Sequence, residues 1–134
     1  MARSRKKSKN RLEKGSYVQV RKDVLNHPNY ASLSHRAARL LWDIWGQYNG
    51  SNNGDFCASY SVMRKKGWTS KDQLYKARDE LVKKGFIEIT RYGGLNMGCH
   101  LYAVTWVKID KCKHILAVGP TQTPSNAWRR TAGN

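Results

Sequence analysis

The segment SKDQLYKARDELVKKGFI, residues 70–87, contains a whole helix with its start and stop signals, followed at once by the beginning of a strand. Ser70 and Gln73 form a capping box, in which the serine oxygen accepts from the third helical amide and the glutamine reaches back. Gly85, which follows two lysines, is a C-terminal stop signal. Three apolar residues at helical spacing predict the buried stripe: Leu74, Ala77 and Leu81. We therefore expect a helix from Lys71 to Lys84.

Two further helices are expected upstream. The nearer one starts at Ser59 and ends by Gly67, and the short turn Gly67-Trp68-Thr69 is of the kind that joins a helix-turn-helix pair. The earlier one starts after Ser34, which stands at an N-cap position, and is stopped by Asn49-Gly50. Its predicted apolar stripe consists of Ala37, Leu41, Ile44, Trp45 and Tyr48.

Strands are expected around these helices. After Gly85 the pattern alternates over Phe86–Tyr92 and Cys99–Val107, which predicts a hairpin joined by the glycine-rich residues 93–98. Asp55–Ala58, after a turn at residues 51–54, is long enough only for a short strand. Tyr17–Val20 alternates as an edge strand would, and a loop through Pro28 follows it. The predicted core comprises Leu41, Ile44, Leu81, Ile87, Trp106 and either Trp42 or Trp45.

Charge divides the chain into three parts. The 134 residues carry 25 Lys and Arg against nine Asp and Glu, a net charge of +16. Such an excess favours a polyanionic partner, and nucleic acid is the commonest one. Residues 1–16 are expected to be a flexible basic arm, residues 17–110 the folded domain, and residues 111–134 a loosely ordered tail. The cations of the arm are Arg3, Arg5, Lys6, Lys7, Lys9, Arg11 and Lys14.

The order of these elements resembles the winged helix-turn-helix. The resemblance covers about residues 17–110 and is carried by four segments: residues 33–41, Asn53-Gly54, residues 80–87 and residues 102–106. It implies an α+β fold of three helices with a C-terminal two-stranded β-hairpin wing and a short additional strand. The combination looks like small DNA-binding proteins of phage, prophage and plasmid replication or regulatory modules.

The resemblance implies that the helix from Lys71 is a recognition helix for the major groove of double-stranded DNA, and that the hairpin is the wing. Arg64, Lys65 and Lys66 would then lie near backbone phosphates. Asp72 and Asp79 oppose a purely electrostatic surface, because carboxylates close to phosphate are unfavourable unless they are paired. Beyond the basic arm, the expected contacts are Arg64, Lys65, Lys66, Ser70, Lys71, Tyr75, Lys76, Lys83, Arg91 and Asn96. Arg36 and Arg39 are expected on the first helix, facing away from its apolar stripe, where solubility alone would be enough to explain them.

An enzyme, a cofactor and a metal site are not expected. The four histidines come without a nucleophile motif, an acidic pair or a phosphate-binding glycine loop. Zinc ligand types occur at Cys99, His100, Cys112 and His114, but their spacing matches no common zinc module. Three widely spaced cysteines fit a reducing compartment, and Cys57 and Cys99 are interpreted as small core residues. No apolar segment is long enough to span a membrane or to form a secretion signal, so a cytoplasmic protein is expected.

Two alternatives to DNA binding stay open. A basic winged helix can bind structured RNA or lie within a ribonucleoprotein. The same scaffold can also serve a phage-encoded interaction protein directed against a host protein or nucleoprotein, as in counter-defence. Winged helices occur as monomers and as dimers, and the absence of a heptad pattern leaves a homodimer undecided.

Overall fold

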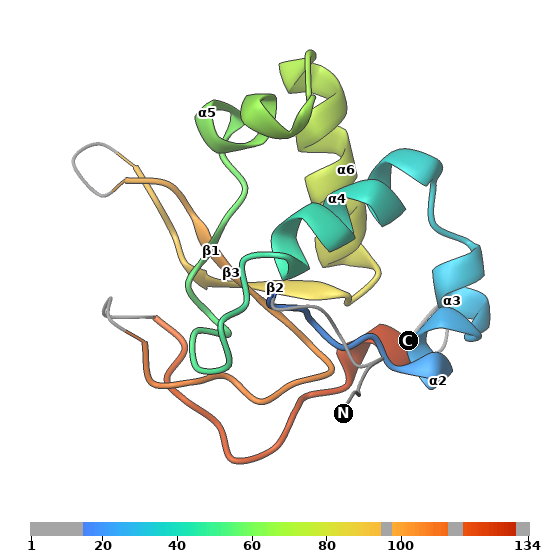
Figure 1. Ribbon diagram of the computed structural model, residues 1–134, viewed down its shortest axis with the longest axis vertical. Coiled ribbons are helices and arrows are strands. Elements are labelled where there is room, and N and C mark those ends of the chain that lie inside the picture. Colours follow the sequence, from blue (N-terminus) through green and yellow to red (C-terminus); the bar gives the residue numbers. More distant parts are fainter. Residues whose placement is uncertain (1–14, 95–97, 113–116, 131–134) are drawn as a thin grey trace, which may run out of the picture.

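The computed structural model describes residues 15–94, 98–112 and 117–130, and shows an α+β protein. Helices cover one side of a small antiparallel sheet, and the C-terminal segment runs along the other side (Figure 1). The main helices are α4 (His35–Trp45), α5 (Tyr60–Met63), which continues as the 3₁₀ turn η1 (Arg64–Lys66), and α6 (Lys71–Lys83). The strands are β1 (Phe56–Cys57), β2 (Ile87–Arg91) and β3 (Leu101–Val104). The predicted α+β class is thereby confirmed.

Helix α4 starts where the sequence predicts and ends earlier. The Ser34 hydroxyl accepts a hydrogen bond from the Ala37 amide at 3.1 Å, as an N-cap should. The last helical residue is Trp45. The Gly46 amide still donates to the Trp42 carbonyl, but the Gln47 and Tyr48 amides donate in 3₁₀ fashion to the Ile44 and Trp45 carbonyls at 3.1 and 3.0 Å. The ring of Tyr48 nevertheless stacks on that of Trp45, with centroids 4.4 Å apart. Tyr48 thus extends the aromatic surface from outside the helix.

The sheet has the strand order β1-β3-β2, and both pairings are antiparallel. The hairpin follows α6 as predicted, but both strands are shorter than the alternation suggested. A register irregularity between Ile89 and Arg91 leaves the Thr90 hydroxyl free to donate to the Gly54 carbonyl at 2.6 Å. At the other end, the Thr105 hydroxyl donates to the Gly85 carbonyl at 2.7 Å, so the chain leaves β3 and turns back toward the end of α6.

Buried Asn53 joins the turn before β1 to the segment that follows β3. Its side-chain amide donates to the carbonyls of Val104, Val107 and Lys108 at 2.9 to 3.1 Å. Its side-chain oxygen accepts from the Val104 amide at 2.9 Å, and its backbone amide donates to Asp110 at the same distance. Because every one of these groups is paired, burial of the polar side chain is stabilising rather than costly.

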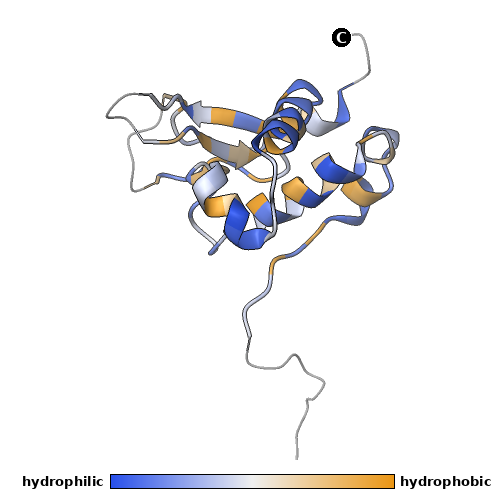
Figure 2. Cartoon of the chain, turned by 90° about the horizontal axis from the view of Figure 1, so that it is seen from above, coloured by the Kyte–Doolittle hydropathy of each residue, from blue (hydrophilic) through white to orange (hydrophobic). Residues whose placement is uncertain are grey.

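The core lies between the helices and the sheet, and the apolar residues of the helices face it (Figure 2). Trp45 meets the predicted core residue Trp106 with ring centroids 5.4 Å apart, while Trp42 is only half-buried. The predicted core residues that are buried are Leu41, Ile44, Trp45, Leu81, Ile87 and Trp106. The core prediction is confirmed, with Trp45 as the more buried of the two alternative tryptophans.

The prediction for the N-terminal part of the domain was wrong. Tyr17–Val20 is irregular rather than a strand, because the Gln19 carbonyl accepts from the Trp45 indole at 2.9 Å instead of from a neighbouring strand. The expected loop contains two one-turn helices, α2 (Lys22–Leu25) and α3 (Pro28–Ala31). His27 caps α3 by accepting the Asn29 amide at 3.0 Å, and Pro28 occupies the first helical position, where its missing N–H costs nothing.

The C-terminal segment is more ordered than the sequence predicts. Residues 117–130 are described, and within them η2 (Ala127–Arg129) places Trp128 in the core with 1% of its surface exposed. The Asn29 side-chain amide donates to the carbonyls of Trp128 and Arg130 at 2.9 and 2.7 Å. The segment from Ala117 to Arg130 is therefore bound to the domain rather than loose.

Candidate nucleic-acid interface

The corner between η1 and α6 is fixed against α4. Gly67 has φ +100°, in the left-handed region that glycine adopts without strain. Trp68 follows, and its backbone amide donates to the Met63 carbonyl at 3.2 Å. Its indole N–H donates to the Asp43 carboxylate of α4 at 2.8 Å, and the ring is buried. The corner therefore holds α5 and α6 in a defined relation to each other.

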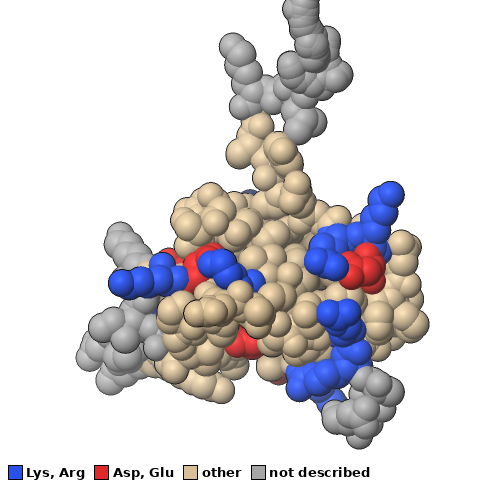
Figure 3. All heavy atoms as spheres, turned by 90° about the horizontal axis from the view of Figure 1, so that it is seen from below, with Lys and Arg blue, Asp and Glu red and all other residues tan. Residues whose placement is uncertain are grey.

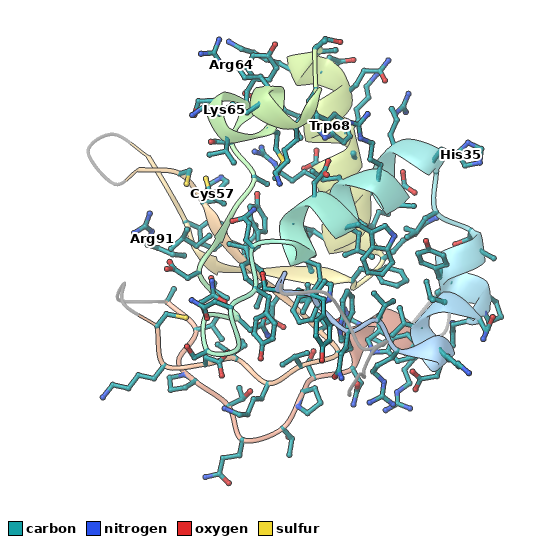
Figure 4. The ribbon with its side chains drawn as sticks, in the orientation of Figure 1. His35, Cys57, Arg64, Lys65, Trp68 and Arg91 are labelled. Atoms are coloured by element: carbon teal, nitrogen blue, oxygen red, sulfur yellow. The ribbon has the colours of Figure 1, made fainter. Side chains whose placement is uncertain are left out.

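Three consecutive cations occupy η1, on the outside of this corner. Arg64, Lys65 and Lys66 are all exposed, and their side chains make no hydrogen bond or ion pair with any residue that the structure describes. Figure 4 shows Arg64 and Lys65 directed away from the body of the protein, whereas Trp68 lies between the helices. These cations are free to meet an anion.

Helix α6 presents its polar side to solvent. Ser70 caps it by accepting from the Gln73 amide at 3.2 Å, and its predicted stripe of Leu74, Ala77 and Leu81 is buried. The side of α6 opposite this stripe is exposed. The exposed residues there are Lys71, Asp72, Gln73, Tyr75, Lys76, Asp79 and Lys83.

Contacts along α6 hold several of these side chains. The Lys76 ammonium lies 3.1 Å from the Asp72 carboxylate, with both side chains mostly exposed. Tyr75, which is 40% exposed, carries the Arg78 guanidinium 4.6 Å from its ring centroid. Arg78 also reaches the Ala58 carbonyl at 3.4 Å. Arg78 was not among the predicted contacts, although its spacing of three from Tyr75 puts the two on neighbouring positions of a helix surface.

A hollow of about 340 Å³ lies at the N-terminal end of α6, between α6 and α4. Arg36 and Arg39 line it, opposite Ser70 and Gln73. Arg36 donates to the Gln73 side-chain oxygen at 3.1 Å, so that carboxamide is engaged by α4 instead of completing the predicted capping box. Arg39 donates to the Lys66 carbonyl and lies over the Trp68 ring, 5.6 Å from its centroid.

These two arginines are therefore more than solubilising charges. They connect α4 to the η1–α6 corner and add positive charge beside the first turn of α6, where the helix dipole also favours anions. The sequence could not reveal this, because the pairing depends on how α4 packs against α6.

The hairpin contributes less positive charge. Arg91 is half-buried and donates to the Cys99 carbonyl at 3.0 Å, and its Nε is buried without a partner among the described residues. Part of the Arg91 guanidinium is thus occupied by the backbone of its own hairpin. The His100 ring accepts from the Gly93 amide at 2.7 Å, which closes the base of the loop. Asn96 lies outside the described residues, as do the predicted cations of the arm from Arg3 to Lys14.

The opposite end of the molecule has a different charge pattern. Viewed from below Figure 1, Lys and Arg form separate groups around a mostly uncharged face, with acidic residues close to two of the groups (Figure 3).

The described residues include no cluster of three or more His, Cys, Asp or Glu side chains that could hold a metal ion. Of the zinc ligand types in the sequence, Cys99 lies beside Cys57, and Cys112 contacts the Asp110 carbonyl at 3.3 Å. His114 lies outside the described residues. The exposed guanidinium and ammonium groups of η1 and α6 can bind anions.

Comparison with models of protein families, with curated protein sequences and with solved structures finds no match. Within residues 15–94, 98–112 and 117–130, no helix combines the length and the apolar content needed to cross a membrane.

Proposed function

We propose that this protein binds double-stranded DNA as a winged helix-turn-helix, with α6 as the recognition helix and the β2–β3 hairpin as the wing. The proposal rests on a set of exposed side chains on two consecutive elements, η1 and α6. We call it the α6 surface, and it consists of Arg64, Lys65, Lys66, Lys71, Tyr75 and Lys76. Arg64, Lys65 and Lys66 lie beside the corner that Trp68 fixes against α4, and Lys71, Tyr75 and Lys76 follow on α6. Under this proposal the cations contact phosphates, and the side chains of α6 reach base edges.

The net charge of +16 supports the same function. Each cation that neutralises a phosphate releases condensed counterions, so the basic arm and the α6 surface together predict strongly salt-dependent affinity. Under this proposal the arm supplies affinity for phosphates, and α6 supplies the preference for particular sequences. The role is regulation or replication of a phage or plasmid element, by binding rather than catalysis.

Matched charge removals test the docking of α6. Lys76→Ala removes one cation from the α6 surface, and Lys111→Ala removes one exposed cation from the segment after β3. Binding to a short random duplex is measured by fluorescence anisotropy over a range of salt concentrations. Lys76→Ala should reduce the slope of log affinity against log salt by about 1, as expected for one lost phosphate contact, and Lys111→Ala should leave it unchanged. Equal slopes for the two variants would count against docking through α6.

Deletion of residues 1–16 tests the arm in the same assay. The expected result is a fall in affinity of several orders of magnitude at low salt, because the arm carries seven of the cations. Unchanged affinity would reject its role. Competition with a structured RNA hairpin at matched salt separates DNA binding from the RNA alternative. Selection from a random duplex library then gives the target, and a palindromic consensus would indicate a homodimer.

A further inference from the structure

Two of the three cysteines meet between β1 and the base of the hairpin. Cys57 is the last residue of β1, and it pairs in register with Leu101 of β3. Cys99 comes two residues before Leu101, so the strand pairing brings it back toward Cys57 across 42 residues of sequence. The two sulfur atoms are 2.7 Å apart, and both residues are free thiols. The labelled Cys57 side chain points toward the hairpin in Figure 4.

The surroundings leave this pair reachable from solvent. Both cysteines are half-buried, in contrast to their expected place as core residues. Cys57 also lies 3.4 Å from the hydroxyl of Ser59, the N-cap of α5. Cys112 has different neighbours, since its sulfur lies near the carbonyls of Asp110 and Asn53. Cys57 and Cys99 are therefore in contact with each other, whereas Cys112 contacts neither and can serve as a control.

We propose that Cys57 and Cys99 are an oxidation site that closes to an intramolecular disulfide by exchange with a small-molecule disulfide such as glutathione disulfide. The thiolate of one cysteine attacks the small disulfide and releases one small thiolate, leaving a mixed disulfide. The second cysteine, as its thiolate, attacks the protein sulfur of that mixed disulfide and releases the second small thiolate. The two protons lost by the cysteines balance the two released thiolates. The protein dithiol is oxidised and the small disulfide is reduced.

Burial raises the pKa of the Cys99 thiol to about 11, and its hydrogen bond with Cys57 acts in the same direction. Cys99 is therefore protonated at neutral pH, and exchange should accelerate as the pH rises, because the thiolate is the reactive form. The closed bond would tie the end of β1 to the base of the hairpin. This inference does not depend on nucleic-acid binding.

The test treats the full chain with glutathione disulfide, alkylates the remaining thiols and measures intact mass. The wild type and Cys112→Ser should each lose two alkylatable thiols and the mass of two hydrogen atoms, and dithiothreitol should restore both. Cys57→Ser and Cys99→Ser should instead stop at a mixed disulfide with glutathione. Peptide mapping of the oxidised wild type requires no substitution and should recover Cys57 linked to Cys99. Three alkylatable thiols after treatment, only mixed disulfides, or a link that involves Cys112 would each overturn the proposal.

Discussion

Helices α4 and α6 have similar lengths and the same kind of N-cap, yet they use their surfaces differently. In α4, five of the 11 residues are buried. In α6, three of the 13 are buried, and the larger part of the helix is polar and exposed. The two helices pack against each other, so the apolar surface of α4 supports a helix whose own side chains are mostly available to a partner.

The difference separates stability from recognition. Substitutions on α4 should act through the core, whereas substitutions on the outside of α6 should act on binding and leave the fold intact. Residues that join the two helices, such as Arg36 and Gln73, should affect both stability and binding.

Ile44→Ala should destabilise the protein most. Ile44 has no exposed surface, and removal of a large buried side chain costs about 2 to 5 kcal/mol of unfolding free energy, from lost burial and the cavity left behind. Tyr75→Ala on α6 should change the unfolding free energy by no more than about 0.5 kcal/mol. Urea denaturation followed by circular dichroism measures both. A loss at Tyr75 as large as that at Ile44 would break the distinction between the helices.

Glycines that follow the two helices offer a second matched pair. Gly50, after α4, and Gly85, after α6, have φ values of +103° and +83°. A Cβ at Gly50 would meet no described atom within 4 Å, but one at Gly85 would lie 2.5 Å from the Ala127 carbonyl oxygen. Gly50→Ala should cost about 1 to 2 kcal/mol for backbone strain alone. Gly85→Ala should cost about 1 to 3 kcal/mol more in thermal or urea unfolding, from the added overlap. Equal losses would mean that the C-terminal segment moves aside freely.

Glu80 of α6 links that helix to the N-cap of α4, and this link should depend on pH. Burial would raise the pKa of Glu80, but hydrogen bonds from the Ser34 amide and hydroxyl, at 2.8 and 2.7 Å, together with Lys84, bring it below its ordinary value. Because the folded pKa is the lower one, the stabilisation is present above the unfolded pKa of about 4.3 and is lost as the pH falls through the folded pKa. Unfolding followed from neutral to acid pH should show a shallower decline for Glu80→Gln than for the wild type.

Glu88 is a second carboxylate whose pKa is shifted in the opposite direction to that of Glu80. Burial raises its pKa, with Arg130 opposing that effect. Its protonated form therefore favours folding below the unfolded pKa, and this contribution is lost as the pH rises through the folded pKa. Glu88→Gln should steepen the acid decline that Glu80→Gln flattens. The same direction of change for both variants would contradict these assignments.

Asp72→Asn should have the smallest effect on stability. It removes the exposed ion pair with Lys76, which contributes only about 0.3 to 0.5 kcal/mol, as helix-surface pairs do. Under the proposed function it should strengthen duplex binding, because the carboxylate repels phosphate and competes for Lys76. Anisotropy at low salt gives the affinity. Asp23→Asn, on α2, is the control, because it removes the same charge and releases a paired cation, Arg21, away from α6. Weaker binding by Asp72→Asn would point to base recognition by the carboxylate.

Local signals in the sequence were enough to predict α4, α6 and the hairpin. Ser34 and Ser70 mark helix starts through bonds to amides three residues away, and a change of period marks the hairpin. Features that need distant partners could not be predicted. Tyr17–Val20 alternates like a strand but pairs with no strand among the described residues. The Gln73 carboxamide accepts from Arg36 rather than bonding to its own helix.

The candidate site was predictable to the same extent. The outward residues of α6 follow from helical geometry, so Lys71, Tyr75 and Lys76 could be named in advance. The roles of Arg39 and Arg91 depend on Trp68 and on the Cys99 carbonyl, which are brought to them only by tertiary packing. The contact between Cys57 and Cys99 likewise results from strand register, which cysteine spacing does not reveal.

The burial of Trp128 has a practical consequence for work with this protein. A fragment cut at Asp110, the boundary that the composition suggests, would leave the hollow that Trp128 fills beside His27 open to water. Such a fragment should expose apolar surface that is normally buried, and should aggregate during purification. Expression work should therefore keep the chain intact through Arg130, and a solubility tag is better attached beyond that residue than in place of it.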